Sequence, residues 1–144
     1  MQEFAVTYTS NFSSHKNFIM ATIEAVMTTQ EVANRMNELF KENKWNEVQE
    51  ELFSEDCESI EPANSPGLKT VKGKAAIKKK GEEFNERMEE MHGGWCSEPI
   101  VGGNYISFAM GLDATMKGMG RVKMEEICVY EVKDGKIVKE QFFF

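Results

Sequence analysis

A glutamate that directly precedes a proline, Glu61-Pro62, is well placed in this chain for acid–base chemistry. Proline disfavours the helical region for the residue before it, so the backbone of Glu61 should stay extended. We therefore expect its carboxylate at the end of a short strand over 57–61, beside a turn-rich loop. A carboxylate there could act as a general base. Alternatively, it could only cap the loop or pair with Lys72 or Lys74.

Glu126 is the second candidate, because alternation along the segment 121–130 places it on the more apolar side of a strand. That side also carries Val122, Met124, Cys128 and Tyr130. An acid near an apolar interior loses hydration, which raises its pKa and suits proton transfer near neutral pH. A register shift of one residue would reverse the side to which Glu126 points. The alternative role for Glu126 is an ion pair at a sheet edge or an interface.

His92 and Trp95 stand near the expected start of the sheet. A histidine titrates near neutral pH and could assist proton transfer; the alternative is a half-exposed place at a strand end. Trp95 could form a flat wall for a ring-shaped ligand, or it could pack in the core. No further Cys or His is close to His92 and Cys96, so we expect no zinc site.

The ten methionines could line an adaptable apolar cavity, although core filling is the simpler interpretation for most of them. The residues that we expect to contact a small apolar ligand, besides Trp95, are Met36, Phe40, Met110, Met124 and Tyr130. The chain has no phosphate loop, nucleophile elbow or dinucleotide fingerprint. We therefore expect no cofactor and no metal.

The bulk composition is that of an acidic globular domain. The 144 residues are 41% hydrophobic and carry a formal net charge of -7, which argues against binding to nucleic acid or to anionic lipid. Three widely spaced cysteines suit a reducing compartment. With no secretion signal and no apolar run of membrane-spanning length, the sequence predicts a cytoplasmic location.

Hydrophobic periodicity predicts helices in the first part of the chain. Residues 1–27 lack sustained periodicity and are expected to be a loosely ordered arm, with a single domain over 28–144. Thr28 and Glu31 form a capping-box pattern that starts a helix, and a second, short helix should end near Phe53. A third helix should carry Ile77, Phe84, Met88 and Met91 on one side, and the run Lys78-Lys79-Lys80 on a solvated face.

From residue 92 the period changes to two, which predicts strands over 92–101, 105–116, 121–133 and 136–144. Asp134-Gly135 is typical of a tight hairpin. These elements predict an α+β domain, with three helices packed in a strongly curved mixed or antiparallel sheet. The sheet should form a cone-like half-barrel with an internal pocket.

Three stretches carry a family resemblance: LFSEDCESIEP, GKAAI and the terminal YEVKDGKIVKEQFFF. Over residues 28–144 the chain resembles the SnoaL-like branch of the nuclear-transport-factor-2-like superfamily. Its relatives include isomerases, cyclases, epoxide hydrolases, dehydratases and non-catalytic binding domains, so the resemblance implies a fold more firmly than an activity.

The resemblance places Glu61 where ketosteroid-isomerase-like relatives carry an acidic general base. The first-helix tyrosine of those relatives is missing, because the matching region reads Arg35-Met36-Asn37. SnoaL-like cyclases place an acid on a late strand, as Glu126 would be. We expect either a cofactor-free isomerase or cyclase that acts on a small apolar carbonyl compound, or a binding or association domain. By analogy, either would be a homodimer formed through the sheet face.

Overall fold

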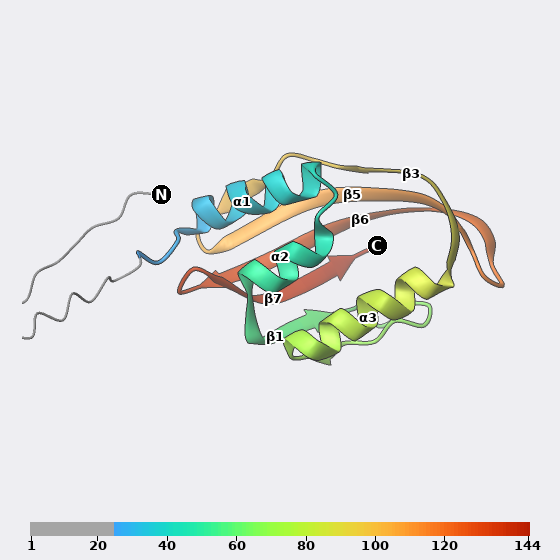
Figure 1. Ribbon diagram of the computed structural model, residues 1–144, viewed down its shortest axis with the longest axis horizontal. Coiled ribbons are helices and arrows are strands. Elements are labelled where there is room, and N and C mark those ends of the chain that lie inside the picture. The colour runs from blue at the N-terminus through green and yellow to red at the C-terminus, as the bar shows by residue number, and fades with distance from the viewer. Residues whose placement is uncertain (1–24) are drawn as a thin grey trace, which may run out of the picture.

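The computed structural model describes residues 25–144, which form three helices and seven strands (Figure 1). The helices are α1 (Thr29–Lys41), α2 (Trp45–Leu52) and α3 (Lys74–Arg87). The strands are β1 (Phe53–Ile60), β2 (Val71–Lys72), β3 (Met88–Cys96), β4 (Ile100–Gly102), β5 (Tyr105–Met116), β6 (Gly120–Lys133) and β7 (Lys136–Phe143). The expected N-terminal arm falls almost wholly on residues 1–24, outside the described part. No helix in the described part is long and apolar enough to cross a membrane.

The capping box predicted at the start of α1 is confirmed. The backbone N–H of Glu31 donates to Thr28 Oγ1 at 3.2 Å, and the N–H of Thr28 donates to Glu31 Oε2 at 2.7 Å. These two bonds satisfy N–H groups that a helix start otherwise leaves without partners. The side of the helix that is buried consists of Val32, Ala33, Met36, Leu39 and Phe40.

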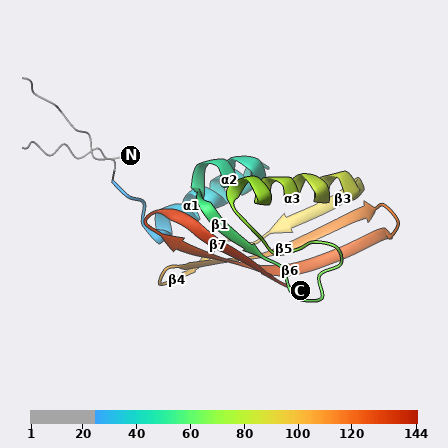
Figure 2. The ribbon, with the colours of Figure 1, turned by 90° about the horizontal axis from the view of Figure 1, so that it is seen from below.

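The strands form one mixed sheet in the order β2-β1-β7-β6-β5-β3, and β4 also pairs with β5. All pairs are antiparallel except β1 with β7, which run parallel. The sheet bends around the helices without closing into a barrel, and all three helices lie on one side of it (Figure 2). The predicted α+β class and curved mixed sheet are therefore confirmed.

The hairpin predicted at Asp134-Gly135 joins β6 to β7. Both residues have positive φ, 50° and 73°, and Lys133 pairs with Lys136 across the turn. Two consecutive positive φ values are typical of a type I′ turn, whose twist matches that of the flanking strands. This turn aligns β7 beside β6, so that Glu140 comes opposite Tyr130.

The third helix is shorter than the periodicity predicted. It ends at Arg87, and Met88 has an extended backbone (φ -84°, ψ 115°). Met88 and Met91 belong to β3, where they pair with Met116 and Ala114 of β5. The helix assignment for these two methionines was wrong, because long-range pairing with β5 overrides the local pattern. The strand predicted over 92–101 is likewise divided into β3 and β4.

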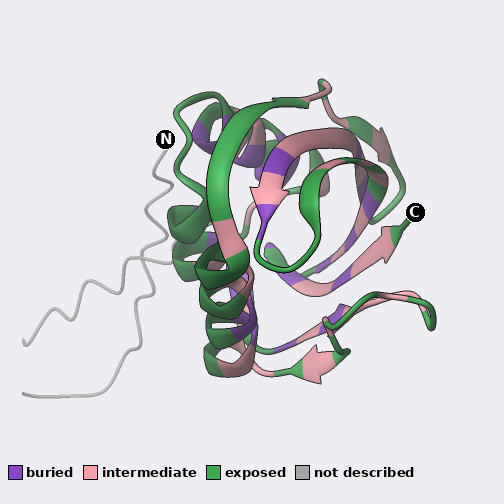
Figure 3. Cartoon of the chain, turned by 90° about the vertical axis from the view of Figure 1, so that its right-hand side faces the viewer, coloured by how far each residue is buried: buried purple, intermediate pink, exposed green. Residues whose placement is uncertain are grey.

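The hydrophobic core lies between the sheet and the helices α1 and α2. Phe40 stacks on Trp45 with ring centroids 4.3 Å apart and meets Phe108 edge-on at 5.1 Å. Phe108 in turn contacts Tyr130 edge-on at 6.2 Å. Buried residues occur on both the helices and the sheet (Figure 3). Together these aromatic contacts fill one end of the concave side of the sheet.

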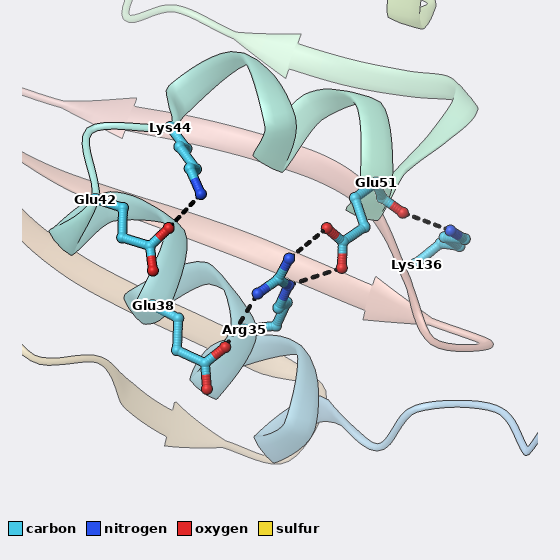
Figure 4. A network of polar contacts seen from close by, with 6 residues as sticks. All are labelled: Arg35, Glu38, Glu42, Lys44, Glu51 and Lys136. Atoms are coloured by element: carbon cyan, nitrogen blue, oxygen red, sulfur yellow. Dashed lines mark hydrogen bonds and ion pairs between the residues drawn. The ribbon is translucent and has the colours of Figure 1, made fainter. Parts of the chain in front are cut away.

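Arg35 holds α1 against α2 from the outside (Figure 4). Its guanidinium donates to both carboxylate oxygens of Glu51, at 2.8 and 2.9 Å, and to Glu38 at 3.2 Å. The bond from Arg35 is the main cause that lowers the pKa of Glu51. Lys136 at the start of β7 donates to the backbone carbonyl of Glu51 at 2.6 Å. The same corner therefore links both helices to the sheet.

Candidate functional site

The concave face of β5 and β6 is filled at one end and partly exposed farther along. The filled end is made by Ile106, Phe108, Cys128 and Tyr130, all of which are buried. The neighbouring inward positions are only half-buried; we call them the open strip, which consists of Met110, Leu112, Met124, Glu126 and Phe142. The strip offers apolar surface with one acid in the middle, an arrangement that suits a small, mostly apolar ligand.

Glu126 points to this concave side, as the alternation predicted. It lies opposite Met110 in the β5–β6 register, and its pKa is raised chiefly by burial. Its Oε1 accepts a weak hydrogen bond from the Cys128 thiol at 3.4 Å. Among the described residues, no cation comes within the 4.0 Å that would make an ion pair with it. Glu126 is thus a desolvated acid that no ion pair or strong hydrogen bond engages within the described residues.

Glu61 follows the end of β1 and also turns inward. Its Oε1 accepts a hydrogen bond from Lys80 Nζ at 2.7 Å, and its backbone N–H donates to Thr70 Oγ1 at 3.1 Å. The partner is therefore neither Lys72 nor Lys74. The solvated face predicted for the three lysines is wrong for Lys80, which is only 9% exposed. It is buried because α3 turns this side chain toward β1, where the carboxylate of Glu61 balances its charge.

Lys80 connects Glu61 to a second buried acid. Its Nζ also donates to Ser59 Oγ at 2.5 Å, and Ser59 Oγ donates to Glu140 Oε1 at 2.6 Å. We call Glu61, Lys80, Ser59 and Glu140 the buried network. Burial raises the pKa of Glu140 to about 7, against the opposing effects of the Ser59 bond and the Lys80 charge. The network thus joins β1, α3 and β7 beside the open strip, where Lys80 Nζ lies over the Phe142 ring, 5.3 Å from its centre.

Three of these four residues were not identified from the sequence, although a signal for them exists. Lys80 stands three residues after Ile77 and four before Phe84, on the same helical face as both. Ser59 alternates with buried Cys57 along β1, and Glu140 alternates with Phe142 along β7. The meeting of Ser59 with Glu140 requires the parallel pairing of β1 with β7, which the sequence did not show.

The structure divides the other predicted site residues into two groups. Met110 and Met124 lie on the open strip, whereas Met36, Phe40 and Tyr130 are core residues that are 0%, 7% and 4% exposed. These three therefore belong to the hydrophobic core and present little surface to a ligand.

His92 and Trp95 are not brought to the strip. The His92 Nε2 lies 2.7 Å from Thr115 Oγ1, and Thr115 alternates with the inward residues of β5. Trp95 is 51% exposed and pairs with Gly111, where an added Cβ would come within 2.1 Å of the indole Nε1. Both side chains therefore lie on the outward face of the sheet. Within residues 25–144, no three His, Cys, Asp or Glu side chains gather as a metal ion would require.

Comparison with known proteins decides the family. The family model described as "SnoaL-like domain" matches residues 27–144. The chain belongs to this SnoaL-like family. A proposed SnoaL-like polyketide cyclase [carbohydrate phosphatase] from Mesorhizobium loti is 34% identical; the match covers 82% of this chain and 100% of that chain, with a TM-score of 0.76.

Two more distant structures share the fold. One is a proposed SnoaL-like polyketide cyclase from Jannaschia sp. CCS1, with 15% identity, coverage of 85% of this chain and 90% of that chain, and a TM-score of 0.64. The other, a hypothetical protein with a ketosteroid-isomerase-like fold from Catenulispora acidiphila, was solved with trimethylamine. It is 15% identical; the match covers 81% of this chain and 87% of that chain, with a TM-score of 0.61. No curated protein matches this SnoaL-like chain.

Proposed function

We propose that this SnoaL-like protein catalyses cofactor-independent proton transfer on a small, largely apolar carbonyl compound, as an isomerase or a cyclase does. The observation that carries the proposal is Glu126, a desolvated acid without an ion-pair partner in the described part of the chain, in the middle of an apolar strip. A carboxylate whose pKa is raised is a stronger base than one in water. The 34% identity with the Mesorhizobium loti protein, named as a proposed polyketide cyclase, supports a substrate with several carbonyl groups.

The proposed reaction begins with Glu126 as the carboxylate. It takes a proton from the carbon next to a carbonyl group; the C–H electron pair forms a C=C bond, and the carbonyl π pair moves to oxygen. The product is an enolate and a protonated Glu126. Where the substrate has a C=C bond next to the α-carbon, the enolate is conjugated with it; the oxygen electron pair re-forms the C=O bond, the C=C bond shifts, and the acid returns the proton to the far carbon, which completes an isomerisation. In a cyclisation, the enolate carbon instead attacks a second carbonyl carbon and forms a C–C bond; the π pair of that carbonyl moves to its oxygen, and Glu126 protonates the resulting alkoxide.

Glu61 has a different part in this proposal. Its Oε1 is engaged by Lys80, whereas Glu126 holds only a weak thiol bond. We therefore assign the proton transfer to Glu126 and treat Glu61 as a positioning residue that fixes the Lys80 ammonium. The proposal therefore changes the order of the two candidates, because the sequence indicated Glu61 first and Glu126 second as the base.

Hydrogen–deuterium exchange tests whether the protein turns over carbonyl compounds or only binds them. A bicyclic ketone such as 2-tetralone is incubated with the protein in D2O, and loss of the α-proton signals is followed by NMR. The proposal predicts exchange faster than in buffer at the same pH. Binding of 2-tetralone without faster exchange would favour a non-catalytic binding module, and the enzymatic proposal would fail.

The outward face of the sheet supports the further proposal that two copies associate there. The helices cover only the concave face, and the outward face exposes Tyr105, Trp95, Ile127 and Phe143. Mixed charge on the same face, including Asp113 with Arg121 at 2.9 Å, suits a self-complementary contact. Sedimentation of the wild type should give a dimer, and Ile127→Asp should give a monomer. A monomeric wild type would contradict this proposal.

A further inference from the structure

We propose that Lys80 is a catalytic residue: one N–H of its ammonium binds the substrate oxygen that becomes negative when Glu126 removes a proton. This inference rests on the proposed function and adds to it the group that stabilises the enolate. It also predicts a ligand class, namely molecules with an anionic oxygen attached to an apolar ring.

The first argument is the number of donors on Lys80. An ammonium has three N–H groups, and within the described residues only two acceptors take them, Ser59 Oγ at 2.5 Å and Glu61 Oε1 at 2.7 Å. One donor therefore has no protein acceptor. The ammonium lies 5.3 Å from the ring centre of Phe142, a residue of the open strip, so it borders the surface where an apolar ligand would lie.

The second argument is the spacing between Lys80 and Glu126. Burial chiefly raises the pKa of Glu126, and the positive charge of Lys80 opposes that effect, so the two groups act on each other. They are nevertheless farther apart than the 4.0 Å of an ion pair. The proposal places the reacting atoms of the substrate between this acid and this cation. The α-carbon would face Glu126, and the carbonyl oxygen would face Lys80.

The third argument is that the ammonium is fixed before any substrate arrives. Ser59 and Glu61 hold its nitrogen on one side, and Glu140 in turn holds the Ser59 hydroxyl at 2.6 Å. The side chain is 10% exposed, so little water competes for its remaining donor. Preorganised donors in such surroundings stabilise developing charge most strongly. The N–H bond of Lys80 stays intact throughout; it stabilises the oxygen charge and transfers no proton.

The experiment uses 4-nitrophenol as a stand-in for the enolate, because its phenolate carries the charge on oxygen and absorbs visible light. Titration of bound and free 4-nitrophenol by absorbance gives the preference of the protein for phenolate over phenol. Wild type should lower the pKa of the bound phenol. Lys80→Met should weaken phenolate binding by about 10- to 100-fold, as expected for one charged hydrogen bond. The control Lys79→Met changes an exposed lysine of the same helix and should have no effect.

The wild type alone can also overturn the inference, even if Lys80→Met fails to fold. A bound 4-nitrophenol whose pKa equals or exceeds its value in water would contradict it, as would no binding at millimolar concentration. Glu126→Gln removes a negative charge and no donor, so the preference for phenolate should persist or increase. Loss of ketone exchange in Glu126→Gln with an unchanged phenolate preference in Lys80→Met would reject the role of Lys80 and leave the proposed function intact.

Discussion

The Lys80 Nζ lies 2.7 Å from Glu61 Oε1, and the two side chains are only 10% and 5% exposed. An ion pair so far from water is costly to break, because removal of one partner leaves a buried charge without compensation. The proposed reaction also uses this pair, because Lys80 would bind the substrate oxygen while Glu126 takes the proton. The stability and the activity of this SnoaL-like protein should therefore respond together to changes at this pair.

Removal of the lysine charge should destabilise the protein strongly. Lys80→Met is expected to lower the free energy of unfolding by about 3–5 kcal/mol, the usual cost of breaking a buried pair. Chemical denaturation measures this loss. Lys79→Met on the same helix should change stability by less than about 0.5 kcal/mol, because that side chain is 76% exposed. The double variant with Glu61→Gln should recover part of the loss. If Lys80→Met has the same free energy of unfolding as Lys79→Met, the Lys80–Glu61 pair does not stabilise the protein.

Glu140 should make stability depend on pH. Its pKa in the folded protein is about 7, against an ordinary value of 4.5, with burial as the main cause. The folded protein therefore keeps a proton that the unfolded chain releases. The stability from this group is complete below pH 4.5 and is lost as the pH rises through 7. The loss should reach about 3 kcal/mol.

The groups that act on the pKa of Glu140 are Ser59 on β1, Lys80 on α3, and Glu61 and Glu126 across the site. Tyr130 lies opposite Glu140 on β6. Glu140→Gln should remove this pH dependence, so its stability relative to wild type should rise between pH 5 and about 8. Exposed Glu89→Gln serves as the control and should follow wild type. If the unfolding free energies of wild type and Glu140→Gln differ by the same amount at every pH, the raised pKa of Glu140 is refuted.

The Arg35–Glu51 contact should contribute little, despite its two short bonds. The side chains are 38% and 43% exposed, and exposed pairs are screened by water and salt. A double-mutant cycle with Arg35→Met and Glu51→Gln should give a coupling energy below about 1 kcal/mol, and smaller still in high salt. A coupling of several kcal/mol would instead show that this corner limits the stability of the fold.

Gly111 should be needed to keep Trp95 flat on the outward face. An added Cβ would lie 2.1 Å from the indole Nε1, so Gly111→Ala must displace the ring. Because Trp95 is already 51% exposed, the unfolding free energy should change by less than about 1 kcal/mol. In a Trp45→Phe variant, Trp95 is the one remaining tryptophan. Adding Gly111→Ala should shift its fluorescence emission to the red, because the displaced ring becomes more exposed to water. An unchanged spectrum would mean that the indole does not cover Gly111.

The sequence predicted the parts of this fold that depend on local pattern. Alternation placed Glu126 inward, and the Asp134-Gly135 turn followed from two residues that tolerate positive φ. The end of α3 was not predictable in the same way. Met88 and Met91 fit a helical period, and they become strand residues because β3 pairs with β5, which is distant in sequence.

The buried network escaped prediction for a similar reason. Lys80 stands in a run of lysines that looks solvated, and only the contact with Ser59 and Glu61 shows its burial. Ser59 and Glu140 are 81 residues apart, and their meeting depends on the parallel pairing of β1 with β7. Such long-range contacts leave little trace in one sequence, so Glu61 and Glu126 could be predicted but Glu140 and Lys80 could not.

The rate of α-proton exchange in 2-tetralone, compared between Glu126→Gln and Glu125→Gln, tests the central claim most directly. The two glutamates are neighbours on β6, and Glu125 is exposed while Glu126 faces the open strip. We predict that Glu126→Gln lowers the exchange rate at least about 100-fold, as loss of a general base does, and that Glu125→Gln retains the wild-type rate. Equal rates in the two variants would contradict the assignment of Glu126 as the group that moves the proton.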